Sequence, residues 1–225
     1  FQVSTTNFKQ FWTRDFGWCT ASLLKLGYAA EVERTLFYAL DVFLRNDKIT
    51  TTITPDGEAY DFPNFAIDSL AWLLHSIALS DKNELVVQFR DFLNKQIEYT
   101  YENFVDKSSG LPLPKRFSSI KDLAVRSRSC YDTCMLALVQ RSAEKLGLVN
   151  PFARYDYTEL LKKNYWNGQY FYDDITRKEY VAADANVFPF YLGIIKDEDM
   201  LRSAVDALKT AKLDLPFAIK YTARN

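Results

Sequence analysis

Glycine and histidine are scarce in this chain of 225 residues, which contains seven glycines and one histidine. The glycines form neither GxGxxG nor the GxxxxGKS or GxxxxGKT pattern, which excludes both standard phosphate-binding loops. One histidine cannot make an HExxH motif or a histidine-rich zinc site. A Ser-His-Asp or Cys-His site would have to use His75, which we interpret as a core histidine without a catalytic role.

The sequence also lacks an excess of either charge and a long apolar run. Its 28 basic residues oppose 29 acidic residues, for a net charge of −1, whereas nucleic-acid-binding proteins usually carry a basic excess. No run of about 18 apolar residues occurs that would predict a membrane span. We therefore expect neither nucleic acid nor a membrane as a partner.

Cysteine is represented only by Cys19, Cys130 and Cys134, an odd number without a CxxC motif. We interpret them as reduced, buried thiols of a cytoplasmic protein. The chain begins with Phe1 rather than methionine, and no charged-then-apolar leader follows. We expect the numbering to start inside a longer gene product.

The main pattern in the sequence is the recurrence of apolar residues at helical spacing. Apolar residues make up 48% of the chain and charged residues 25%, which is typical of a globular protein, while aromatic residues reach 16%. The period of 3.6 predicts eight helices, at residues 8–26, 29–45, 65–78, 84–104, 131–146, 158–165, 185–195 and 198–211. The β-branched run 48–54 and the turn Asp56-Gly57 predict a short hairpin or an extended loop, and residues 169–173 predict a strand-like excursion.

The predicted helices come in pairs with long connections, which is the arrangement that a toroid of helical hairpins requires. We expect inner helices that are apolar nearly all round, amphipathic outer helices, and long loops at the rim that holds the site. No linker composition interrupts the chain. The sequence therefore predicts one all-α domain, residues 1–225, with short β excursions in its loops.

Two aspartates stand where the helical period calls for an apolar residue. Asp15 falls on the stripe of residues 8–26, and Asp68 falls on the stripe of residues 65–78. A buried carboxylate costs several kcal/mol unless it is paired. Each aspartate has a structural explanation, an ion pair with arginine or, for Asp68, an N-cap after Pro63-Asn64. Each also has a functional explanation, in which it accepts hydrogen bonds from substrate hydroxyls at a pocket mouth.

Aromatic residues flank these carboxylates, and a sugar site uses that combination. The C–H faces of a pyranose stack on aromatic rings, while its hydroxyls need charged acceptors. We expect most of the candidate rings to be ordinary core residues; the candidates are Trp12, Trp18, Tyr60, Trp72, Tyr131 and Trp166. The loop 117–131 is dense in charge and forms either a solvated surface or part of the rim; its charges are Lys121, Asp122, Arg126 and Arg128, with Asp132 following.

Several short stretches follow one another along the chain: FWTRD (11–15) with LLKLG (23–27), ITP (53–55) with YDFP (60–63), IDSLAW (67–72), YDT (131–133) with LAL (136–138), YWN (165–167) with YFYD (170–173), and DAN (184–186) with PFYLG (189–193). In this order they resemble the six-hairpin glycosidases. The similarity is closest to the glycogen-debranching amylo-α-1,6-glucosidases, with trehalases, processing α-glucosidases and mannosylglycerate hydrolases further away.

The resemblance implies an (α/α)6 toroid and a glycosidase that hydrolyses an α-glucosidic bond of an oligo- or polysaccharide with inversion. In such a reaction a carboxylic acid protonates the leaving oxygen and a carboxylate activates water. The family's acid lies in the loop before the middle inner helix, which points to Asp122, although Lys121 replaces the tryptophan of the debranching pattern. The residues implied in substrate binding are Arg14, Asp15, Trp18, Tyr60, Asp68, Trp72, Arg126, Tyr131, Asp132 and Asp184.

Length limits what this chain can contain. Twelve helices need about 350 residues, and eight are predicted here. We expect an incomplete toroid that the rest of the polypeptide completes, with the catalytic base outside this chain and with no cofactor or metal. The alternative is an inactive helical carbohydrate-binding or scaffold protein. A terpenoid-cyclase-like toroid would need a DDxxD motif for Mg²⁺, which Asp173-Asp174 does not complete.

Overall fold

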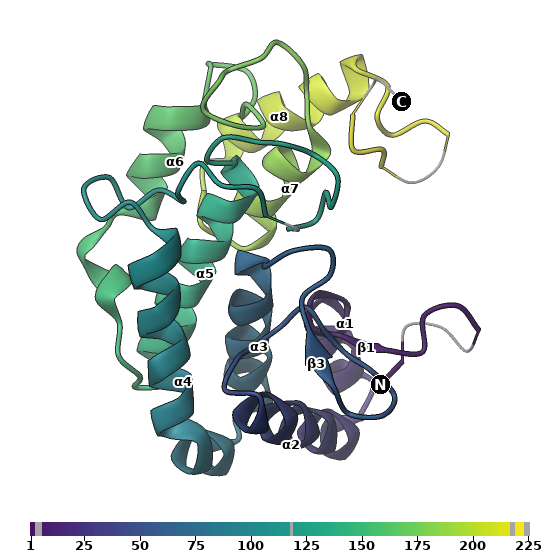
Figure 1. Cartoon of the computed structure of the whole chain (residues 1–225). Helices are drawn as coiled ribbons and strands as arrows, with labels where there is room; N and C mark the ends of the chain where they lie inside the picture. Colours follow the sequence, from purple (N-terminus) through teal and green to yellow (C-terminus); the bar gives the residue numbers. More distant parts are fainter. Residues whose placement is uncertain (3–5, 118, 217–218, 223–225) are drawn as a thin grey trace. The chain divides into compact units, whose positions relative to one another are not determined.

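The computed structural model describes residues 1–2, 6–117, 119–216 and 219–222, and this part of the chain holds eight α-helices and one three-stranded sheet (Figure 1). The chain divides into two compact units. Unit 1 comprises Phe1–Asn103, Phe117–Leu123 and Leu138–Phe152. Unit 2 comprises Phe104–Arg116, Ala124–Ala137 and Ala153–Asn225. The predicted single domain over residues 1–225 stays a prediction.

The elements follow the predicted order closely. In sequence they are β1 (Phe11–Trp12), α1 (Thr13–Lys25), α2 (Ala29–Arg45), β2 (Thr52–Ile53), β3 (Ala59–Tyr60), α3 (Ile67–Ser80), α4 (Asn83–Phe104), α5 (Cys130–Lys145), a 3₁₀ turn (Pro151–Arg154), α6 (Tyr157–Tyr165), α7 (Ala183–Tyr191) and α8 (Glu198–Thr210). The predicted hairpin is confirmed, since β2 pairs antiparallel with β3 around a turn in which Gly57 has φ 86°. Residues 169–173 contribute only one isolated bridge, Trp166 to Phe171.

In unit 1, α3 is buried on nearly all sides, whereas α2 is buried on one face. Every residue of α3 from Ile67 to Ala78 is buried except His75, so this helix packs on all sides. By contrast α2 buries one face and leaves Phe37 and Tyr38 exposed on the other. Both α1 and α2 pack against α3. The contrast between α3 and α2 agrees with the predicted inner and outer helices, whereas α1 buries only one face.

The first helix departs from its prediction in both its start and its buried face. It begins at Thr13 instead of residue 8, because Phe11 and Trp12 pair with β2 in the sheet. Its buried residues are Thr13, Phe16, Gly17 and Thr20, and Cys19 is exposed, so the predicted stripe and the buried Cys19 thiol are wrong. Three of the four residues on this face are a glycine and two threonines. A search for hydrophobic residues at helical spacing does not count these residue types, so it misses the face.

Close packing explains the glycine on that face. A Cβ atom added to Gly17 would lie 2.5 Å from Cβ of Trp72 on α3, a separation that side chains do not adopt. Trp72 itself is only 1% exposed. The approach of α1 to α3 therefore depends on a residue without a side chain at position 17.

Unit 2 repeats the contrast between helices. The first turns of α5 and α7 are buried, including Cys130, Tyr131, Ala183 and Asp184. In α8 the buried residues are Ala204 and Leu208, and Leu208 belongs to a core cluster with Ala183 of α7. Among the residues described, no helix combines the length and the apolar character needed to span a lipid bilayer.

Candidate functional site

The odd-numbered helices share a feature at their N-termini. Each carries an aspartate in its first turn that is buried or partly buried: Asp15 in α1, Asp68 in α3, Asp132 in α5 and Asp184 in α7. The even-numbered helices also begin with acidic residues, but those are exposed. A helix N-terminus favours a negative charge whether that charge is buried or exposed. Because burial adds a cost, the four aspartates need a further explanation.

In unit 1, Arg14 joins two of the predicted carboxylates. Its Nε donates to Oδ2 of Asp68 over 2.6 Å, and its Nη2 lies 3.9 Å from Oδ1 of Asp122. The Asp68 side chain is fully buried, while that of Asp122 is 44% exposed. The arginine pairing considered for Asp68 is confirmed. The N-cap is not, because α3 is capped by Ala66 without a side-chain hydrogen bond.

Asp15 belongs to the same group of charges. Burial raises the pKa of its carboxyl, and the neighbouring carboxylates of Asp68 and Asp122 raise it further, against the lowering effect of Arg14 and of a backbone hydrogen bond. Arg14 therefore pairs with Asp68 and Asp122, and Asp15, the next residue along α1, interacts electrostatically with all three. Such a group offers both acceptors and donors to the hydroxyls of a sugar.

The aromatic candidates of unit 1 differ in their access to solvent. Trp18 is 36% exposed, and Tyr60 on β3 is partly exposed. Trp72 lies edge-on to Trp18, with ring centroids 6.3 Å apart, inside the core. Trp72 therefore packs against Trp18 and holds α1 on α3. It presents no ring face on which a sugar could stack.

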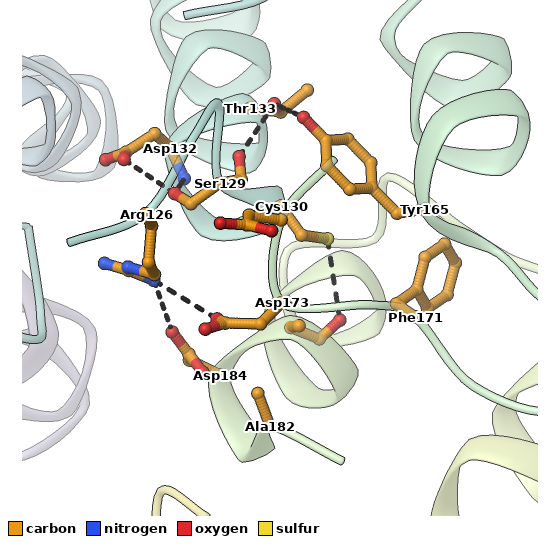
Figure 2. Close-up of polar contacts among 12 residues, drawn as sticks. Arg126, Ser129, Cys130, Asp132, Thr133, Tyr165, Phe171, Asp173, Ala182 and Asp184 are labelled. Atoms are coloured by element: carbon orange, nitrogen blue, oxygen red, sulfur yellow. Dashed lines mark hydrogen bonds and ion pairs between the residues drawn. The ribbon is translucent and has the colours of Figure 1, made fainter. Parts of the chain in front are cut away.

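In unit 2, Arg126 lies between two buried carboxylates (Figure 2). Its Nη1 is 3.0 Å from Oδ2 of Asp184 and 3.5 Å from Oδ1 of Asp173, and all three side chains are at most 7% exposed. Burial by itself lowers the pKa of Arg126, but the carboxylates of Asp132, Asp184 and Asp173 outweigh it and raise that pKa. The guanidinium therefore stays charged, and it links the loop before α5 to the first turn of α7.

Asp132 has a structural role that the sequence analysis missed. Its backbone N–H donates to Oγ of Ser129 over 3.0 Å, and the Ser129 hydroxyl donates to its carboxylate over 2.6 Å (Figure 2). The Ser129 hydroxyl therefore caps the start of α5, and the Asp132 carboxylate orients that hydroxyl. The pattern Ser-x-x-Asp at 129–132 is the sequence signal that predicts it. Its neighbour Tyr131 is fully buried against Phe188, with centroids 4.9 Å apart.

Asp173 and Tyr180 were also missed as members of this cluster. The Tyr180 hydroxyl donates to Oδ2 of Asp173 over 2.5 Å. Burial, together with that bond, raises the pKa of Tyr180, so its hydroxyl stays protonated at neutral pH. The YFYD stretch held the signal for Asp173, whereas nothing around Tyr180 indicated its partner. Within the described ranges no group of three side chains is placed to hold a metal ion.

No protein-family model and no curated protein sequence matches this chain. In fold it is similar to a rhamnosidase from Klebsiella oxytoca with rhamnose bound, at a TM-score of 0.64 and 10% sequence identity. The similarity covers 94% of this chain and 43% of that protein, so this chain spans less than half of its length. The predicted fold class is confirmed: an all-α arrangement of helical hairpins as found in a glycosidase, with eight helices in the described residues.

Proposed function

We propose that this chain forms part of a glycoside hydrolase that cleaves an α-glucosidic bond with inversion. The observation that carries the proposal is the pairing of Arg14 with Asp68 and Asp122, with Asp15 coupled to all three; the 36%-exposed Trp18 follows Arg14 by four residues on α1. The helical fold shared with a rhamnosidase supports a glycosidase in general. The choice of an α-glucosidic bond rests on the resemblance of the sequence to debranching glucosidases.

Each residue of the group has a role that its position allows. Arg14 and Asp68 are ordered by their own bond, so they are set in place before a sugar arrives, and with Asp15 they bind the hydroxyls of the sugar whose bond is cleaved. Asp122 lies on a loop and is 44% exposed, which lets it reach the glycosidic oxygen as the general acid. Trp18 and Tyr60 offer ring surfaces to the sugar.

The residues of unit 2 complete the proposal. We assign Arg126, Asp132 and Asp184 to further sugar contacts, with Tyr131 and Trp72 as supports of the two sites. We place the catalytic base outside this chain. The three cysteines are free thiols, which suits the reducing conditions of the cytoplasm.

An Asp122→Asn variant of the full-length protein tests the proposal. It should lose at least about a hundredfold in kcat while its affinity for the product sugar stays within about threefold, because an amide N–H is not acidic enough to protonate the glycosidic oxygen. Asp56→Asn, at an exposed turn of the same unit, is the matched control and should keep full activity. The substrates are trehalose, isomaltose, maltooligosaccharides, glycosyl-glycerates and an α-rhamnoside, with the anomer formed first identified by NMR.

Retention of the anomeric configuration would reject the inverting mechanism, and full activity of Asp122→Asn would reject the assigned acid. The second candidate function is a carbohydrate-binding protein without catalysis. It is favoured by Lys121, which stands beside the assigned acid where the debranching pattern has tryptophan. That candidate predicts sugar binding by the unaltered protein with no turnover of any substrate.

A further inference from the structure

The outward side of α2 combines large apolar side chains with charged ones. Phe37 is 44% exposed, Tyr38 43% and Leu44 45%. Single exposed apolar residues are common on proteins, but several on one helix face are typical of an interaction surface. We call this surface the α2 face, and its exposed or partly exposed members are Ala30, Glu31, Arg34, Phe37, Tyr38, Asp41, Leu44 and Arg45.

The central ring of the α2 face is fixed at its base. Phe37 packs edge-on against Phe89 of α4, with ring centroids 5.9 Å apart, and Phe89 is only 2% exposed. The backbone of the face belongs to a regular helix. Because the ring is already ordered, little side-chain entropy is lost when a partner covers its exposed part.

The charges of the α2 face alternate in sign along the helix, in the order Glu31, Arg34, Asp41 and Arg45. Within the helix they form two pairs, since Arg34 lies 3.1 Å from Glu31 and Arg45 lies 3.2 Å from Asp41. All four side chains are at least 48% exposed, so these pairs contribute little to stability by themselves.

This order of charges is complementary to itself when two copies of α2 lie antiparallel. Arg34 lies three residues before Phe37, and Asp41 lies three residues after Tyr38. A twofold axis that passes between the two aromatic residues therefore places Arg34 of each copy opposite Asp41 of the other. Two parallel helices would instead place each arginine opposite its own counterpart, so the charges favour the antiparallel arrangement.

The outer charges fit the same axis. Glu31 lies six residues before Phe37 and Arg45 lies seven residues after Tyr38, so the two come opposite to within one residue, or about 1.5 Å along the helix. Each half of the helix pair then contains a closed ring of four alternating charges, in which two contacts lie within the helices and two lie between the copies.

We propose that the α2 face binds the same face of a second copy of this chain, with the two helices antiparallel about a twofold axis. Aromatic residues and arginine, which this face offers, are enriched in protein interfaces. One pair of helices buries little surface, so we expect a dissociation constant on the order of 10 μM. The inference does not depend on the proposed function.

Sedimentation equilibrium of the full-length protein tests this with two variants that each exchange the charges of half the face. One variant combines Glu31→Arg with Arg34→Glu, and the other combines Asp41→Arg with Arg45→Glu. Each keeps its net charge and an oppositely charged pair within the helix. Each alone sets like charges against each other across the axis, so its dimer should weaken at least about tenfold.

An equimolar mixture of the two variants should restore the dimer. The reversed half of one chain then meets the reversed half of the other, and the unaltered halves also match, so the affinity should return to within about threefold of the original. Glu198→Arg with Arg202→Glu is the matched control, because it exchanges an exposed pair 3.3 Å apart on α8 and should leave the dimer unchanged.

Three results would overturn the inference: an unaltered protein that stays monomeric at concentrations on the order of 100 μM, a dimer that persists in both exchange variants, or a mixture that stays monomeric. The first would mean that water, another segment of the polypeptide or a different protein covers the face. Circular dichroism shows whether the variants fold. If an exchange variant fails to fold, Phe37→Ala takes its place, and its dimer should weaken at least about tenfold.

Discussion

Arg14 donates to Asp68 over 2.6 Å and so joins the first turns of α1 and α3 across 54 positions of sequence. The two partners differ in access, because the arginine side chain is 19% exposed and the aspartate side chain is fully buried. The buried carboxylate therefore depends on a guanidinium that can still reach solvent. This geometry suits a pair that both stabilises the fold and meets a ligand.

Replacement of Arg14 by methionine should destabilise unit 1 by about 3 kcal/mol, because it leaves the Asp68 carboxylate buried without its guanidinium. Urea denaturation followed by circular dichroism measures the free energy of unfolding. In a double-mutant cycle of Arg14→Met with Asp68→Asn, the coupling energy should exceed about 1.5 kcal/mol.

Asp122 supplies the control for that cycle. It lies 3.9 Å from the same guanidinium but is 44% exposed, so water and salt screen the interaction. A cycle of Arg14→Met with Asp122→Asn should give a coupling energy below about 1 kcal/mol. Equal coupling in the two cycles would contradict the view that burial decides the strength of these pairs.

In unit 2, replacement of Arg126 by methionine should cost about 3–5 kcal/mol of stability at neutral pH, because Asp173 and Asp184 would remain buried without their shared cation. Arg202→Met is the matched control. Arg202 pairs with Glu198 at 3.3 Å, but its side chain is 72% exposed, so its loss should change stability by less than about 1 kcal/mol. Comparable losses from both variants would rule out the proposed dependence on burial.

The sequence predicted most helices well because apolar side chains carry their buried faces. The second helix was predicted at residues 29–45 and is found there. In α1 the buried face is made of Thr13, Phe16, Gly17 and Thr20, so the apolar period pointed to the wrong stripe. The sequence could not predict that Trp12 belongs to β1 instead of the helix. That assignment depends on strand pairing with Thr52, which lies 40 residues away in the sequence.

The site was partly predictable for a similar reason. A charge on an apolar helix such as α3 is visible in the sequence, and Asp68 is indeed buried and paired. The partner is not visible, because the link from Arg14 to Asp68 and the link from Arg126 to Asp184 each span more than 50 positions. The residue types of the site were therefore predictable from the local sequence pattern. Which arginine pairs with which aspartate could be learned only from the fold.

The burial of His75 on α3 can be tested by the pH dependence of stability. Burial, with the nearby charges of Arg141 and Lys145, lowers the pKa of His75 from 6.5 to about 4. Between those values the unfolded chain binds a proton that the folded chain does not, so stability is full above pH 6.5 and falls as the pH approaches 4. From pH 7 to pH 5 the unaltered protein should therefore lose on the order of 1–2 kcal/mol more than His75→Gln. Urea titrations of both proteins at the two pH values measure the difference, and parallel losses would show that His75 keeps an ordinary pKa beside Trp72.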